Sequence, residues 1–141
     1  MIELRAAGES DRELLWLIQS TSMRPAVEAT WGWDESFQRS YFDEHYGAVP
    51  FQIVRVNGHD AGMLCWEVGP DHVFLRNVAL LPDFQGRGIG TEVIRAVMAE
   101  AADRGVPLRL QVLKTNRAQR LYERLGFHTY AETATHLQMT Q

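Results

Sequence analysis

The residues with the clearest chemical potential are three alternating glycines in the segment Gln85-Gly86-Arg87-Gly88-Ile89-Gly90. The segment follows an apolar run typical of a strand (73–81) and leads directly into an amphipathic pattern typical of a helix (88–104). Glycine lets the backbone approach a ligand closely and adopt positive φ. The first N–H groups of a helix have no partner within the helix and lie at the positive end of its dipole. We therefore expect this loop to bind a phosphate or pyrophosphate group.

The spacing of the glycines excludes two common phosphate-binding motifs. A dinucleotide fingerprint that starts at Gly86 and Gly88 needs a third glycine at position 91, where the chain has Thr91. A P-loop needs Gly-Lys-Ser/Thr, and no lysine lies in or beside the loop. The loop therefore belongs to another class of phosphate-binding site.

Serine, cysteine and histidine do not indicate a second kind of site. Every serine lies at or before Ser40, and there is no Gly-x-Ser-x-Gly segment, which argues against a serine hydrolase. The single Cys65 lies between apolar neighbours, so we expect a buried, unreactive thiol. The five histidines lack the spacing of metal ligands, so we expect no metal.

The composition predicts one domain over residues 1–141. The chain is 45% hydrophobic and 23% charged, which is enough apolar material for one core. Its net charge of −4 provides no basic field for nucleic acid. The start of the chain lacks the pattern of a signal peptide, and no apolar run is long enough to cross a membrane. We expect a cytoplasmic protein whose partners include neither nucleic acid nor membrane.

Hydrophobic periodicity and turn residues predict the elements that position the loop. In the first half we expect a strand over 2–6, a helix that begins near Ser10 or Asp11 and is interrupted at Pro25, and a helix capped by Asp34 that ends near His45. Asn57-Gly58 is a strong hairpin signal between strands 51–56 and 61–68. The second half predicts strands over 73–81, 108–113, 127–131 and 135–139, and helices over 88–104 and after Asn116.

The order of these elements predicts a mixed sheet and an α+β fold. Strand 73–81, helix 88–104 and strand 108–113 form a right-handed crossover, so the two strands run parallel. The hairpins on either side are antiparallel. Ligands in such sheets bind outside the carboxyl ends of parallel strands, where the chain diverges, and the glycine loop lies at that end.

Two parts of the chain resemble the GNAT superfamily of N-acetyltransferases. Residues 85–90 match the family's Gln/Arg-x-x-Gly-x-Gly/Ala motif at every required position, and Val78-Ala79-Leu80-Leu81-Pro82 resembles the strand segment that precedes it. Asn116-Arg117-Ala118, with Leu121 to Phe127, resembles the second conserved block. The order of elements agrees as well, so the resemblance covers essentially the whole chain.

The resemblance implies about seven strands and about four helices, with the two central parallel strands splayed to admit acetyl-CoA. Backbone amides from Arg87 to Thr91 would hold the pyrophosphate, Gln85 would order the loop, and the backbone of Val78 to Leu80 would pair with the pantetheine arm. Asn116 would bond the cofactor or the helix start near it. The implied cofactor-binding residues are Val78, Ala79, Leu80, Gln85, Gly86, Arg87, Gly88, Ile89, Gly90, Thr91, Asn116 and Tyr122.

The activity implied by the resemblance is direct acetyl transfer from acetyl-CoA to a primary amine. An alkylamine of pKa about 10.4 is neutral in only about one molecule in a thousand near pH 7, so a base or water chain must remove a proton. The backbone N–H of Leu80 would stabilise the oxyanion, and Tyr122 would protonate the leaving sulfur, although a packing role for Tyr122 is also open. Glu67 is the first candidate for the base, followed by His72 and residues 34–35.

The acceptor is the least defined part of the prediction. Trp31, Trp33 and Asp34 could grip a cationic acceptor, or the indoles could cover the core while Asp34 caps a helix. Arg76 could instead hold a substrate carboxylate.

We expect a small-molecule amine as the acceptor, with peptide or protein acetylation and an inactive acyl-CoA-binding regulatory module as alternatives. A closed, tryptophan-lined pocket would favour a metabolite, and an open groove would favour a protein. The final strands offer exposed edges, so we also expect that a homodimer can form.

Overall fold

A sheet of seven strands in the order β1-β2-β3-β4-β5-β7-β6 organises the protein. The computed structural model describes residues 1–48 and 50–141. The strands are β1 (Ile2–Ala6), β2 (Gln52–Val56), β3 (His59–Val68), β4 (Val73–Leu80), β5 (Leu108–Leu113), β6 (His128–Glu132) and β7 (His136–Thr140). The pair β4–β5 is parallel and the other neighbours are antiparallel, which confirms the predicted mixed sheet and α+β fold.

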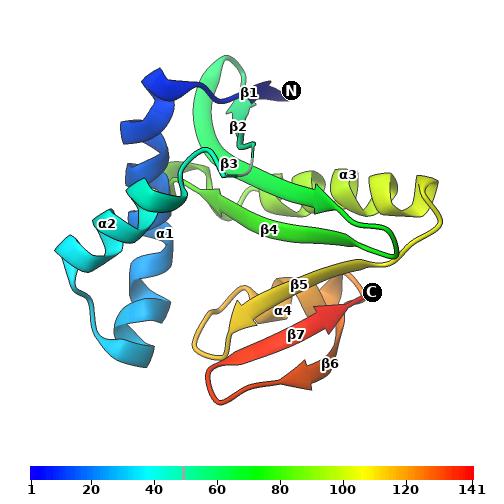
Figure 1. The fold of residues 1–141 in the computed structure, drawn as a ribbon. Helices are drawn as coiled ribbons and strands as arrows, with labels where there is room; N and C mark the ends of the chain where they lie inside the picture. Colours follow the sequence, from blue (N-terminus) through cyan, green and yellow to red (C-terminus); the bar gives the residue numbers. More distant parts are fainter. Residues whose placement is uncertain (49) are drawn as a thin grey trace.

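In the described part of the chain, four α-helices cover the two faces of this sheet: α1 (Arg12–Trp31), α2 (Glu35–His45), α3 (Ile89–Asp103) and α4 (Gln119–Arg124). In Figure 1, α1 and α2 stand to the left, while α3 lies behind β3 and β4. The core follows the same division, because Val54 packs with α3 residues and its strand neighbour Ile53 packs with α1 and α2 residues. Among residues 1–48 and 50–141, no helix has both the length and the apolarity to span a membrane.

Several local predictions are confirmed. Asn57 and Gly58 adopt φ values of 51° and 83°, as a two-residue hairpin turn with a left-handed backbone requires. The Asp34 side chain accepts a hydrogen bond from the Phe37 N–H at 3.0 Å and so caps α2. In α3, the stripe with a four-residue repeat faces the core: Ile89, Val93, Val97 and Ala101 are all buried.

The prediction that Pro25 interrupts the first helix is wrong, because α1 continues through it to Trp31. Proline has no N–H, so the carbonyl of Thr21 loses its helical partner. The turn after the proline is held by tertiary contacts instead. Ala26 packs against Leu113 of β5, and the Thr115 hydroxyl donates a hydrogen bond to the Ala26 carbonyl at 2.9 Å. These contacts keep α1 helical beyond Pro25 in spite of the hydrogen bond that the proline removes.

The parallel strands β4 and β5 separate after three paired residues. The register between β4 and β5 runs from Val73 opposite Leu108 to Leu75 opposite Leu110. In the same place the β3–β4 register shifts, leaving Arg76 as an extra residue in β4. A bulge of this kind bends its strand, so β4 turns away from β5 after Arg76. The predicted splay of the parallel pair is therefore confirmed.

Candidate active site

A cleft of about 830 Å³ opens where β4 leaves β5. Its walls come from α1, the end of β4, the glycine loop with the first turn of α3, and residues 115–124. Ten of the residues predicted to bind the cofactor line it: Val78, Ala79, Leu80, Gln85, Gly86, Gly88, Gly90, Thr91, Asn116 and Tyr122. The structure thus brings two segments about thirty residues apart in the sequence to the same cleft, at the size that small-molecule sites commonly have.

The glycine loop has the backbone that its residue types predicted. Gly86 and Gly88 adopt left-handed φ values of 74° and 79°, and Gly88 is the N-cap of α3. The unpaired N–H groups at the start of α3 therefore border the cleft. The Gln85 side chain donates a hydrogen bond to the Leu80 carbonyl at 2.9 Å, which ties the loop to β4.

Two residues of the motif point elsewhere. The Arg87 guanidinium lies over the Phe84 ring, 5.5 Å from its centroid, and the side chain is not among those that line the cleft. The Ile89 side chain is buried in the core beneath α3. A ligand can meet these two residues through their backbone.

The end of β4 presents a free backbone edge to the cleft. The Leu81 N–H donates to the Ala61 carbonyl of β3 at 2.8 Å. Backbone groups of successive strand residues point to alternate edges, so the N–H groups of Leu80 and Val78 point toward the side that β5 has left. This is the edge with which an extended ligand can pair.

Tyr122 serves both the core and the cleft. Its ring is only 8% exposed and packs edge-on against Phe127, with 5.8 Å between the ring centroids. The residue also lines the cleft, and its hydroxyl has no hydrogen-bond partner among the described residues. Burial raises the pKa of the Tyr122 phenol to about 12, so the group stays protonated near neutral pH.

Asn116 has a local structural role, but it is not the N-cap of α4, which is Ala118. Its side chain accepts a hydrogen bond from the Ala118 N–H at 2.9 Å. The predicted helix after Asn116 begins later, at Gln119, so Asn116 stabilises the turn that leads into α4. The side chain remains on the wall of the cleft.

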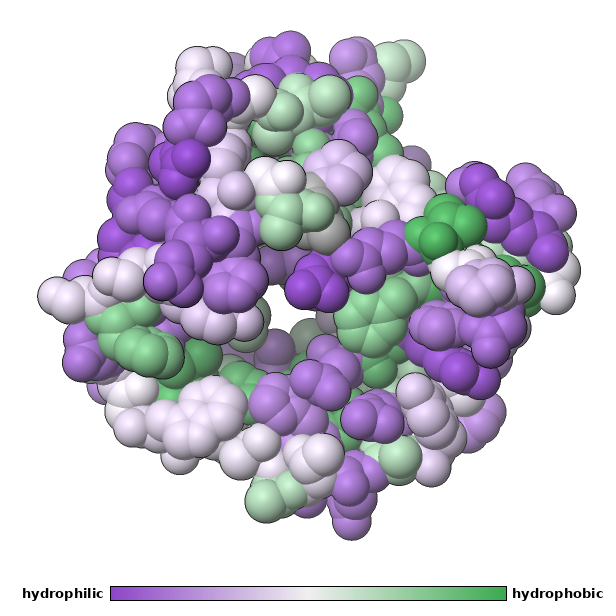
Figure 2. All heavy atoms as spheres, viewed as in Figure 1, coloured by the Kyte–Doolittle hydropathy of each residue, from purple (hydrophilic) through white to green (hydrophobic). Residues whose placement is uncertain are grey.

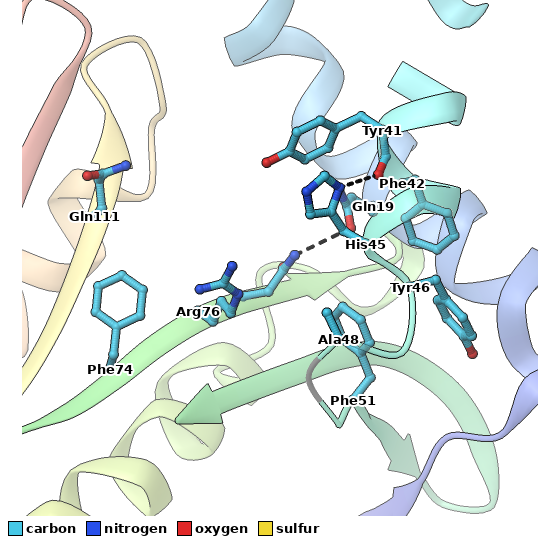
Figure 3. A pocket seen from close by; sticks show the side chains of 11 residues that line it. Gln19, Tyr41, Phe42, His45, Tyr46, Ala48, Phe51, Phe74, Arg76 and Gln111 are labelled. Carbon is cyan, nitrogen blue, oxygen red and sulfur yellow. Dashed lines mark hydrogen bonds between the residues drawn. The ribbon is translucent and has the colours of Figure 1, made fainter. Parts of the chain in front are cut away.

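A second cavity, of about 330 Å³, lies between α2 and the exposed face of β4 and β5 (Figure 3). It is lined by Gln19, Tyr41, Phe42, His45, Tyr46, Ala48, Phe51, Phe74, Arg76, Asn77 and Gln111. Asn77 lines this cavity, whereas the next residue, Val78, lines the cleft. Because successive strand side chains face opposite sides, the two cavities lie on opposite sides of β4.

The molecule is open at this point. Figure 2 shows a hole through the centre of the molecule, where Figure 1 shows β4 and β5 moving apart. The Asn77 amide of β4 donates to the Gln19 side chain of α1 at 3.5 Å. Two molecules can therefore approach the parted strands from opposite sides.

The tryptophan segment lies away from both cavities. Trp31 is 60% exposed, and Trp33 stacks on Trp16 with 6.5 Å between centroids. The Trp33 N–H donates to the Glu35 carboxylate at 2.8 Å, and Asp34 caps α2. None of the predicted acceptor residues Trp31, Trp33 and Asp34 lines either cavity. Packing describes Trp33 and capping describes Asp34, whereas Trp31 is largely exposed.

Among the predicted acceptor residues, Arg76 does line the second cavity. Glu67, the first candidate for the base, lies 3.6 Å from the Arg76 guanidinium and outside the cavity lining. Sequence reasoning missed Tyr41, His45 and Gln111, which come from α2 and β5 and meet only in the folded chain. The spacing of Tyr41 and His45 was the one available signal, because residues four apart in a helix lie on the same face.

Cys65 is buried in β3, as predicted. Burial raises the pKa of its thiol to about 11, and the nearby negative charge of Glu67 acts in the same direction. The thiolate that would react is therefore scarce at neutral pH.

The fold and the cleft define an α+β protein with a glycine-rich loop beside two parted parallel strands. The chain belongs to the acetyltransferase (GNAT) family, whose model matches residues 13–127. The family resemblance of the sequence is therefore confirmed.

Two curated relatives are similar to part of the chain. The [ribosomal protein bS18]-alanine N-acetyltransferase of Escherichia coli K12 is 36% identical over 98 residues, which cover 68% of this chain and 64% of the relative. The thialysine N-epsilon-acetyltransferase of Bos taurus is 38% identical over 63 residues, or 43% of this chain and 37% of the relative. The chain thus matches less than two thirds of the length of either relative.

Solved structures share the fold over the whole chain. The PaiA N-acetyltransferase of Thermoplasma acidophilum, solved in complex with coenzyme A, has a TM-score of 0.82 at 17% identity, covering 100% of this chain and 98% of that one. The ribosomal-protein-S18-alanine N-acetyltransferase of Escherichia coli has a TM-score of 0.67 at 24% identity, covering 99% and 92%.

Proposed function

We propose that this chain is an acetyl-CoA-dependent N-acetyltransferase that acetylates the N-terminal α-amine of a peptide or protein. The observation that carries the proposal is the pair of cavities on opposite sides of β4, at the point where it leaves β5. One cavity offers sites for phosphates, and the other offers amide side chains. The reacting groups would meet in the gap between them.

The charges of the cleft suit coenzyme A. Two arginines, Arg117 and Arg124, are among its lining residues, and no carboxylate is, within the part of the chain that the structure describes. The start of α3 adds the positive end of a helix dipole. A ligand with several phosphates therefore meets attraction along the cleft and no acidic side chain on its walls.

The residues around the parted strands have defined roles in this proposal. Bound acetyl-CoA supplies a thioester carbonyl that an amine can attack. The Leu80 N–H, on the free edge of β4, donates to the carbonyl oxygen as negative charge develops there, which can be worth roughly 3 kcal/mol. The Tyr122 phenol, protonated because of its burial, donates its proton to the leaving sulfur.

Two observations favour a peptide amine over the small molecule that the sequence favoured. First, the tryptophans that would have enclosed a metabolite do not line the second cavity, and this cavity opens to the surface. Second, its amides at Gln19, Asn77 and Gln111 can pair with peptide groups, while no carboxylate among its described lining residues could hold a second cation. The alanine N-acetyltransferase activity named for the bacterial relative agrees with this choice.

The test is mass spectrometry of three probes incubated with enzyme and acetyl-CoA: the amide of Ala-Ala-Ala-Tyr, the same peptide with a formylated amine, and spermidine. We expect one acetyl group on the first peptide and none on the formylated one. A product with spermidine alone would contradict the peptide assignment and support a small-molecule acceptor. Binding of coenzyme A without any product would support the inactive binding module.

A further inference from the structure

The second cavity contains one side chain suited to accept a proton from an amine. Among its described lining residues the ionisable groups are Tyr41, Tyr46, Arg76 and His45, and there is no Asp or Glu. Arginine stays protonated at any relevant pH, and phenols are poor bases in their usual protonated form. Tyr46 also donates its hydroxyl to the Gly8 carbonyl at 2.7 Å. Imidazole is the side chain that most often serves as a general base.

The hydrogen bond of His45 fixes which ring nitrogen is free. Its Nδ1 lies 2.8 Å from the backbone carbonyl oxygen of Tyr41, one turn earlier in α2. A carbonyl oxygen can only accept, so Nδ1 carries the hydrogen and the neutral ring keeps its lone pair on Nε2. The ring also stacks on Tyr41, with 4.0 Å between centroids and 24° between planes. The base is therefore held in one tautomer and one orientation.

The His45 and Arg76 side chains line the same cavity. Figure 3 shows the imidazole between the Tyr41 ring and the Arg76 side chain, with Gln19 and Gln111 on the cavity walls. Glu67 lies 3.6 Å from the Arg76 guanidinium and outside the lining, so it is engaged with the arginine instead of facing the acceptor.

From this geometry we infer that His45 is the general base of the reaction, an assignment that rests on the proposed function. An N–H bond of the acceptor ammonium breaks, its electron pair stays on the amine nitrogen, and the proton binds His45 Nε2. The exposed imidazole then gives the proton to water and returns to its neutral form.

The test compares His45→Gln with a matched control, His59→Gln, which lies at the exposed β2–β3 hairpin. Each variant is assayed with two acceptors: the Ala-Ala-Ala-Tyr amide and O-methylhydroxylamine, whose nitrogen is already neutral at pH 7. We expect His45→Gln to lower kcat/KM for the peptide about 100-fold and to leave the rate with O-methylhydroxylamine unchanged. Added imidazole should restore part of the lost peptide rate. His59→Gln should match the wild type with both acceptors.

Equal rates of His45→Gln and His59→Gln with the peptide would overturn the inference and leave the proposed function intact. A loss of the same size with both acceptors would also overturn it, because a merely structural role slows every acceptor. Thermal melting and coenzyme A titration of each variant identify a general loss of structure. A wild-type chain that acetylates neither acceptor would instead contradict the proposed function itself.

Discussion

Tyr122 packs in the core and is also the proposed proton donor. Its ring packs on Phe127, and its phenol has a pKa raised to about 12 by burial alone. A proton donor must keep its proton until the sulfur leaves, and the phenol is in this protonated form near neutral pH.

We expect Tyr122→Phe to lower kcat about 100-fold while the affinity for coenzyme A changes little, because the ring that packs in the core is kept. Steady-state rates and calorimetric titration measure the two quantities. In the wild type, the protonated phenol is the active form, so deprotonation of Tyr122 should cause no loss of kcat until the pH approaches 12. An unchanged kcat in the variant would remove the phenol from the mechanism.

Gly62 sets how closely β3 and β4 approach near the proposed oxyanion donor. A Cβ at this buried position would clash with the Ala79 carbonyl oxygen and press on Leu80. We expect Gly62→Ala to lower the free energy of unfolding by about 1–3 kcal/mol and also to lower kcat. Thermal melting and steady-state rates measure the two effects.

The matched control is Gly8→Ala, since Gly8 has open space around its Cβ position and an extended φ of −121°. This variant should melt and turn over like the wild type. A Gly62→Ala variant that also behaves like the wild type would show that neither stability nor turnover needs the close approach of β3 and β4 at this point.

At the scale of elements, the glycine loop and α3 act as one unit. Gly88 begins α3 with a left-handed φ of 79°, and Gly105 follows the same helix with a φ of 69°. A Cβ would have open space at both positions. An alanine at either position therefore meets only the strain of a left-handed backbone, which is similar at the two sites.

Comparing alanine at these two positions separates the effect of backbone strain on stability from the effect of the substitution on ligand binding. We expect Gly88→Ala and Gly105→Ala to lower stability by similar amounts, about 1–2 kcal/mol. Only Gly88→Ala should weaken coenzyme A binding in a calorimetric titration, because Gly88 borders the cleft. Equal affinities in the two variants would show that the loop backbone does not hold the pyrophosphate.

Elements set by local chemistry could be predicted, and those set by tertiary contact could not. The turn at Asn57-Gly58 and the cap at Asp34 depend on neighbouring residues and were correct. The passage of α1 through Pro25 depends on Thr115, ninety residues later, and was missed. The cleft between β4 and β5 could be predicted, because each of the motifs that line it is contiguous in the sequence. The second cavity could not be predicted, because His45 and Gln111 meet only after folding.

At the scale of the whole molecule, charged groups join the start of the chain to the sheet. The Arg5 guanidinium lies 2.9 Å from Asp11 before α1 and 3.3 Å from Asp60 in β3. The Gly8 N–H donates to the same Asp11 carboxylate at 2.8 Å. The hydrogen bonds from Arg5 and then Gly8 hold the pKa of Asp11 below its usual value of 3.8.

A lowered pKa gives stability that is present above pH 3.8 and is lost as the pH falls through the folded-state pKa of Asp11. We expect Asp11→Asn to lower the free energy of unfolding by about 1–2 kcal/mol at pH 7. The difference from wild type should shrink below pH 3.8. Urea unfolding across this range measures it, with the exposed Asp103→Asn as a control that should follow the wild type.

The central claim is that the cleft between β4 and β5 binds coenzyme A and thereby presents an acetyl group to an amine on the other side of the strands. Isothermal titration of the wild-type chain with coenzyme A tests it most directly. We predict saturable binding of one molecule per chain, weakened by Gly88→Ala and unchanged by Gly105→Ala. A folded wild-type chain that gives no binding heat and no saturation would contradict the account.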